Sequence, residues 1–242
     1  MAEIKRKKKR ILRPARLLAA VFVPLALAIG LFCLFASINR QPPYEPLSED
    51  AISALRASAP VETPQREAAV QAGLTLLGKV HYFWGGKSDA LGWDEAWGQP
   101  KEVTSTGSQS TGETKPYGLD CSGFVAWGYV QLGLSPTEVE EAVGHGTWNQ
   151  WDRSTPIKWK ELRVGDWVFQ NKYPTDKGNH IGICIGFNEK GKPLFLHCAS
   201  GFDNVVVTGA GGVFRYARRP MVYDALEAGE IPAPAASPSP AA

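Results

Sequence analysis

Cys121, His180 and His197 are the residues of this 242-residue sequence whose types and surroundings favour catalysis. Cys121 follows Asp120 and precedes Ser-Gly in the stretch GLDCSGFVAWGY, which has the pattern of a helix start. A thiol at that position faces unpaired backbone N–H groups and the positive end of the helix dipole, so we expect a lowered pKa and a reactive thiolate. The same N–H groups can stabilise an oxyanion during acyl transfer. The alternative is a buried, unreactive thiol.

The two histidines lie in consecutive predicted strands. His180 begins the apolar stretch HIGICIGF, and His197 lies in PLFLHCA. The segment between them, NEKGK, is typical of a hairpin loop, so the two strands should pair. Pairing brings the imidazoles together as a base and the group that orients it. Taken singly, each histidine is more typical of a structural residue, but together with Cys121 they predict thiol catalysis.

A metal site built from cysteines and histidines is the competing interpretation. The sequence contains no C-x-x-C or H-x-x-x-H spacing. Cys198 directly follows the second histidine, so in a strand its side chain points to the opposite face, while Cys184 lies about 13 Å along the strand from His180. We therefore expect no metal and no cofactor, and we interpret both cysteines as packing residues. His81 and His145 lack a matching context, and we predict no catalytic role for them.

The first 38 residues have the pattern of a membrane anchor. Residues 1–16 carry eight Lys/Arg against one acidic residue, and 17–38 contain no charge. A helix of that length spans about 33 Å, enough for a hydrocarbon core of about 30 Å. The positive-inside rule then places the N-terminus in the bacterial cytoplasm and the rest of the chain outside. On this interpretation the basic arm sets the orientation of the anchor in the membrane and does not bind nucleic acid. A cleaved signal peptide and a buried helix of a soluble protein fit less well.

Cysteine usage agrees with an exported thiol enzyme. Cys33 falls within 17–38, which leaves three of the four cysteines for the exported part. An odd number argues against a disulfide framework and for at least one free thiol.

The remaining sequence predicts one domain of class α+β. The expected regions are a basic arm (1–16), a transmembrane anchor (17–38), a linker with a short helix from Ser48 (39–62), a catalytic domain (63–225) and a disordered Pro/Ala tail (226–242). Within the domain, apolar spacing predicts early helices at 63–78 and 122–132. Short β-branched and aromatic stretches follow at 166–170, 180–187, 193–199, 204–208 and 213–218. Helices followed by an antiparallel sheet are typical of α+β domains.

Five ordered segments resemble the signature segments of the NlpC/P60 cell-wall peptidases. They are YFWGG (82–86), DCSGF (120–124), ELRVGDWVF (161–169), HIGICIG (180–186) and FLHCAS (195–200), and the similarity covers about 70–220. The resemblance implies a papain-like fold, with N-terminal helices packed on a small antiparallel sheet, that cleaves the peptide stems of bacterial peptidoglycan. It implies Cys121 as nucleophile, His180 as general base, His197 as the orienting residue and Tyr82 as a hydroxyl that stabilises the oxyanion. It also implies that Asp120 and Ser122 contact the substrate's amine and backbone.

The chain departs from the family pattern in an insert at 87–118 and in the stretch GHGTWNQW (144–151). The candidate substrate contacts are Trp84 in YFWGG, Trp93 and Trp97 in the insert, and Trp148 in the second stretch, although such tryptophans are equally typical of a core. Gly123 is expected to leave space for a substrate backbone. The insert is a lid, a glycan-stacking surface or a solvated loop, and the sequence leaves these alternatives open.

Together these features predict a membrane-anchored cysteine endopeptidase that acts outside the cytoplasmic membrane. The resemblance favours hydrolysis of the bond between γ-D-glutamate and the diamino acid of a peptidoglycan stem. The alternatives are a CHAP-like amidase or acyltransferase on the same fold and a non-catalytic wall-binding module. Expected partners are the stem peptide and, through 17–38, the membrane, with a wall-remodelling or secretion apparatus as a further candidate and no nucleic acid. The sequence does not decide whether the diamino acid is diaminopimelate or lysine, or whether the substrate needs a free L-Ala end.

Overall fold

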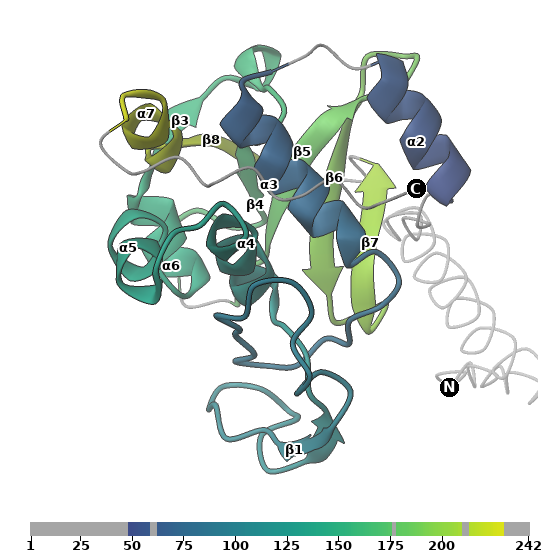
Figure 1. Cartoon of the computed structure of the whole chain (residues 1–242), viewed down its shortest axis with the longest axis vertical. Coiled ribbons are helices and arrows are strands. Elements are labelled where there is room, and N and C mark those ends of the chain that lie inside the picture. The colour runs from purple at the N-terminus through teal and green to yellow at the C-terminus, as the bar shows by residue number, and fades with distance from the viewer. Residues whose placement is uncertain (1–47, 59–61, 176–177, 210–212, 230–242) are drawn as a thin grey trace, which may run out of the picture. The chain divides into compact units, whose positions relative to one another are not determined.

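A computed structural model describes residues 48–58, 62–175, 178–209 and 213–229 of the chain (Figure 1). The predicted basic arm and anchor, and the tail from residue 230, lie outside these residues. In the ranges that the structure describes, no helix combines the length and the apolar character needed to cross a membrane.

The described domain is built on an antiparallel sheet. Its strands are β3 Ser154–Ile157, β4 Trp167–Phe169, β5 Ile181–Phe187, β6 Pro193–Ala199, β7 Asn204–Gly209 and β8 Tyr216–Pro220. They run in the order β3-β8-β4-β5-β6-β7, and each neighbouring pair is antiparallel. The five predicted strands are therefore confirmed, including the hairpin that joins β5 to β6. Strand β3, whose two central residues are exposed, was not predicted.

Helices cover one face of this sheet, which confirms the α+β class. The helices are α2 Glu49–Ser58, α3 Pro64–Thr75, α4 Cys121–Val130, α5 Pro136–Ala142, α6 Thr147–Asp152 and α7 Val222–Glu227, with a short 3-10 turn at Trp159–Glu161. Figure 1 shows α3 crossing in front of β5 and β6, with α4 beside it. The last helix, α7, extends two residues beyond the predicted domain end at 225.

The side chains of β5 and β6 alternate between two cores. Ile183 and Leu196 pack with the helices, whereas Cys184 and Phe195 pack on the other face of the sheet. This alternation follows from the two-residue period of a strand. It also places Cys198 among the helix-facing residues, and all three described cysteines are free thiols. Cys184 and Cys198 are buried packing residues, as predicted.

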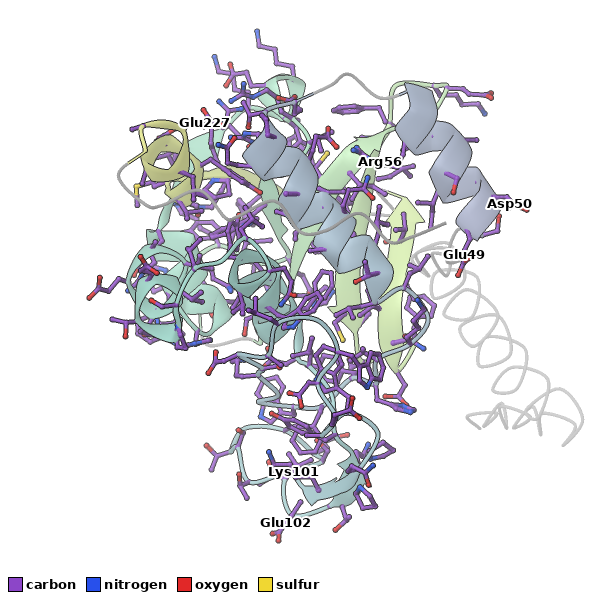
Figure 2. The ribbon with its side chains drawn as sticks, viewed as in Figure 1. Glu49, Asp50, Arg56, Lys101, Glu102 and Glu227 are labelled. Carbon is purple, nitrogen blue, oxygen red and sulfur yellow. The ribbon has the colours of Figure 1, made fainter. Side chains whose placement is uncertain are left out.

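Helix α2 belongs to the packed domain, although its residues fall in the expected linker. The predicted start is confirmed, because Ser48 caps the helix through a hydrogen bond from the Ala51 amide to its hydroxyl oxygen. Ile52 is buried in the core, and Arg56 Nη1 donates to the Ile185 carbonyl oxygen at 2.8 Å. Figure 2 shows Arg56 reaching from α2 towards the sheet.

A buried ion pair explains the presence of Asp166 in the segment ELRVGDWVF. Arg66 of α3 donates to Asp166 at 2.8 Å, and both side chains are almost fully shielded from solvent. Arg219 also donates to Asp166 at 3.1 Å, and Tyr223 places its ring 4.3 Å from the Arg66 guanidinium carbon. Because an unpaired buried charge is costly, these cations fix Asp166 as a structural residue.

The insert at 87–118 folds back onto α4. Its strands β1 Pro100–Glu102 and β2 Thr114–Pro116 pair at the outer end, where Figure 2 shows Lys101 and Glu102. Nearer the domain, Trp97 packs edge-on against Trp127 of α4, with 5.7 Å between ring centroids. The Ala90 carbonyl accepts hydrogen bonds from Trp127 Nε1 and Gln131 Nε2. The insert is therefore attached to the helix that begins at Cys121.

Candidate active site

Cys121 is the first residue of α4, and Asp120 is its cap. Asp120 Oδ1 accepts hydrogen bonds from the Gly123 amide at 2.6 Å and from the Ser122 hydroxyl at 2.7 Å. An acidic side chain at this position satisfies amide groups that a helix start leaves unpaired. The structure thus confirms the predicted helix start at Cys121.

Gly123 has a different role from the one expected. A Cβ atom added at this position would lie 2.1 Å from the carbonyl oxygen of Gly86, which is closer than real Cβ atoms come. The space beside Gly123 is therefore filled by the segment YFWGG and not left open for a substrate. The expectation of substrate access was wrong because this loop packs directly on the first turn of α4.

His180 and His197 form a hydrogen-bonded chain with Thr208. His180 Nε2 lies 2.8 Å from His197 Nδ1, and His197 Nε2 lies 2.9 Å from Thr208 Oγ1. The β5–β6 hairpin and the neighbouring strand β7 bring the three side chains together. Phe214 stacks on the His180 ring, with 5.4 Å between centroids and 16° between planes. The predicted contact between the two histidines is confirmed. Thr208 hydrogen-bonds to His197 and Phe214 packs on His180, and neither contact was predicted.

Cys121 lies next to this chain and to Tyr82. The backbone amide of Ile181, the residue after His180, hydrogen-bonds to the Cys121 thiol. Tyr82 is close enough to Cys121 for the two side chains to interact electrostatically, and its backbone bridges to Leu119. The Cys121 thiol therefore lies beside the residue that follows His180 and within electrostatic reach of Tyr82.

The thiol is not a preformed thiolate. Burial, and then the charge of Asp120, raise the pKa of Cys121 to about 12, against the opposing effects of the Ile181 amide and Lys87. The expected lowering of this pKa was wrong, because desolvation disfavours the charged form more than the helix start favours it. Burial also lowers the pKa of His180 to about 4. Both groups are uncharged at pH 7.

Two further groups near the thiol keep a defined protonation state. Burial is the largest cause that raises the pKa of Tyr82, so its hydroxyl stays protonated and able to donate. Burial and the neighbouring His180 lower the pKa of His197 well below its ordinary value. His197 is therefore a neutral imidazole that orients its partner through a hydrogen bond.

Cys121 opens onto a cleft of about 580 Å³. Five of its lining residues were predicted or flagged from the sequence: Trp84, Asp120, Cys121, Ser122 and Trp148. Residues that were not singled out as substrate contacts also line it, among them Lys87, Ser105, Thr106, His145, Tyr173 and Asn179. Ser105 and Thr106 belong to the insert, which therefore forms part of one wall.

The four predicted tryptophans fall into two groups. Trp84 and Trp148 line the cleft, and Trp148 is 56% exposed. Trp97 is buried against the core, so its expected substrate contact was wrong, and Trp93 packs edge-on against it at 5.0 Å between centroids without lining the cleft. Aromatic residues suit both a core and a sugar-binding surface, so their spacing alone did not separate the two.

Lys87 is the charged residue of the cleft that the sequence did not reveal. Its ammonium lies 2.6 Å from Asp120 Oδ2 and 3.1 Å from Ser122 Oγ. Lys87 directly follows the segment YFWGG, and that position could have drawn attention to it. Among the described residues, no group of three or more His, Cys, Asp or Glu side chains is arranged to hold a metal ion.

Known proteins similar to this chain were found by family model, by sequence and by structure. The family model described as "NlpC/P60 family" matches residues 78–210. Peptidoglycan DL-endopeptidase CwlO of Bacillus licheniformis is 28% identical over 120 residues, which are 50% of this chain and 20% of that protein. The chain thus spans about a fifth of the length of this curated relative.

Two solved structures from Mycobacterium tuberculosis are also similar. The peptidoglycan hydrolase RipB is 18% identical, with a TM-score of 0.44 over 72% of this chain and 68% of that one. RipD, described as a non-catalytic NlpC/p60 domain protein adapted to peptidoglycan binding, is 19% identical and has a TM-score of 0.41. The match covers 65% of this chain and 98% of RipD. Because the family model covers more than half of its residues, this chain belongs to the NlpC/P60 family.

Proposed function

We propose that this chain is a cysteine peptidase that hydrolyses the stem peptides of bacterial peptidoglycan. Family membership and a curated relative named as a peptidoglycan endopeptidase support the substrate class. The observation that carries the proposal is that Cys121 lines the cleft and its thiol accepts a hydrogen bond from the Ile181 amide, directly after His180 of the hydrogen-bonded chain with His197 and Thr208.

The neutral thiol and the neutral imidazole define the proposed first step. As Cys121 Sγ attacks the scissile carbonyl carbon, its proton passes to Nδ1 of His180, the ring nitrogen that His197 leaves available. The carbonyl oxygen gains the negative charge, which N–H groups at the start of α4 and the Tyr82 hydroxyl stabilise. The nearby carboxylate of Asp120 favours the imidazolium that forms on His180.

The second half of the reaction returns the enzyme to its resting state. His180 gives its proton to the leaving amine, and the acyl group stays on Cys121 as a thioester. Water then attacks the thioester and His180 accepts a proton from this water. The C–S bond breaks, His180 passes that proton to the departing sulfur of Cys121, and the acid product leaves. His197 and Thr208 hold the His180 ring in one orientation throughout.

Two finer assignments belong to the same proposal. The cleaved bond is the one between γ-D-glutamate and the diamino acid, in line with the resemblance of the signature segments. Residues 17–38 anchor the chain in the cytoplasmic membrane with its N-terminus inside, so the domain acts on the wall from outside; the uncharged stretch and the preceding basic arm support this.

A digest of purified peptidoglycan tests the function. The full-length chain should release products that end in γ-D-glutamate, whereas Cys121→Ala should release none. The matched control is Cys184→Ala, which removes a buried thiol on the other face of the sheet and should leave the digest unchanged. Free muramyl-lactyl ends in the mass spectrum would mean an amidase, and an active Cys121→Ala protein would end the thiol mechanism.

A non-catalytic wall-binding module is the second candidate. The raised pKa of the Cys121 thiol favours it, because a protonated thiol is a weak nucleophile. Iodoacetamide separates the two functions: a catalytic Cys121 should be alkylated at least about tenfold faster than Cys184 and Cys198, because it alone lines the cleft and has an adjacent base. Equal, slow labelling of all three, with no digestion, would favour the binding module.

A further inference from the structure

The cleft holds its own cation where a substrate amine was expected. Asp120 Oδ1 accepts the Gly123 amide and the Ser122 hydroxyl, and Oδ2 accepts Lys87 Nζ at 2.6 Å. Both carboxylate oxygens of Asp120 therefore have donors from the protein itself. Lys87 also lies 3.1 Å from the Ser122 oxygen, so its ammonium is held by two side chains next to Cys121.

This arrangement changes what the cleft can bind. The side chain of Lys87 keeps 29% of its surface exposed, and it lines the cleft together with Cys121. A substrate ammonium beside Asp120 would have to displace Lys87 or lie next to it. Two like charges about 4 Å apart at a partly buried site weaken binding by at least about tenfold. An amide carbonyl or a carboxylate would instead gain a donor.

We propose that Lys87 determines specificity by excluding a free amine from the cleft and selecting an uncharged or anionic group there. For a stem peptide, the favoured substrate then has an acylated N-terminus, as in a stem still joined to its glycan. The disfavoured substrate is a released peptide with a free N-terminal amine. This inference rests on the proposed function, since it names which stem peptides that site accepts.

Two synthetic stem peptides test the proposal, identical except that one has a free α-amine and the other is N-acetylated. Isothermal titration calorimetry with the full-length Cys121→Ala protein at pH 7 should show at least about tenfold tighter binding of the acetylated peptide. Adding Lys87→Met should bring the ratio to one or reverse it, because Asp120 can then accept the peptide ammonium. Lys87→Arg, which keeps the cation, should preserve the preference.

A pH series provides the same test without a Lys87 variant. At pH 9 the α-amine, with an ordinary pKa of about 8, is largely uncharged, so its peptide should approach the affinity of the acetylated one. The proposal is wrong if the Lys87-containing protein binds the free-amine peptide equally well or better, if the acetylated peptide does not bind, or if Lys87→Met weakens both peptides alike.

The outcome for Lys87 can be separated from the outcome for the enzyme. If wild-type protein digests intact peptidoglycan but shows no preference for the acetylated peptide, only the role of Lys87 fails. If the acetylated peptide binds as expected but wild-type protein releases no product from peptidoglycan, the selectivity stands and the hydrolase function fails.

Discussion

Replacing Thr208 by valine is the most informative test of the histidine chain. Thr208 is fully buried, and its hydroxyl lies 2.9 Å from His197 Nε2. Valine has nearly the same shape but no hydroxyl group, so the change removes one hydrogen-bond partner from His197. Thr208 does not line the cleft, so substrate contacts should be unaffected.

The expected effect follows from the direction of the hydrogen bonds. For Nδ1 of His180 to accept the thiol proton, His180 must donate from Nε2 to His197 Nδ1, and His197 must donate from Nε2 to Thr208. Without the hydroxyl, His197 favours the opposite tautomer and donates to His180, which moves the His180 proton to Nδ1 and blocks the base. A lost partner for a buried group costs about 1–3 kcal/mol.

Loss of this hydrogen bond should lower both the stability of the protein and its reaction rate. We expect Thr208→Val to lower the free energy of unfolding by about 1–2 kcal/mol and kcat by about tenfold or more, with KM nearly unchanged. Steady-state digestion of a stem peptide gives the rates, and ¹⁵N chemical shifts of the histidine rings report the tautomer. Thr208→Ser is the control and should retain most of the activity. A folded Thr208→Val protein with kcat within twofold of wild type would refute the assigned direction.

Three further predictions concern stability. The pKa of His180 is about 4 in the folded protein and about 6.5 in the unfolded chain, so its contribution to the free energy of unfolding is complete above pH 6.5 and falls by about 3 kcal/mol as the pH drops to 4. In denaturant unfolding, the stability of His180→Gln should therefore depend less on pH than that of the wild type. In the same assay, Gly123→Ala should lower the free energy of unfolding by about 1–3 kcal/mol, because its Cβ would lie 2.1 Å from a carbonyl oxygen. Gly128→Ala in the same helix, whose Cβ would have its nearest atom at 3.7 Å, should be neutral or stabilising. Equal effects of the two substitutions would contradict the packing described for Gly123. Arg66→Met should cost about 3 kcal/mol by leaving the Asp166 charge less compensated, and adding Asp166→Asn should recover part of the loss.

Local patterns predicted most of the secondary structure that carries the site. The strands at β5 and β6 are long, apolar and separated by a short polar turn, so their type and pairing follow from the sequence alone. Pairing then places His180 beside His197 without further information. The start of α4 was predictable for the same reason, because Asp120 and the residues after it form a local capping pattern.

The properties that depend on tertiary packing were not predictable. The pKa of Cys121 is set by how deeply the loop and strands bury it, and burial is not encoded in the residues next to it. Trp97 and Trp148 both lie in stretches of mainly small and polar residues, yet one enters the core and the other lines the cleft. Lys87 was missed because its partner Asp120 is 33 residues away in the chain.

The attachment of the insert to α4 has a consequence for turnover. Trp97 and the Ala90 carbonyl attach this segment along the same helix that begins at Cys121, so the wall that contains Ser105 and Thr106 is connected to the helix that carries the proposed nucleophile. Under the proposed function, we expect an entrance attached in this way to lose little conformational entropy when substrate binds. The catalytic cycle should therefore be limited by bond-making steps or by diffusion through a dense polymer, and not by the opening of a gate.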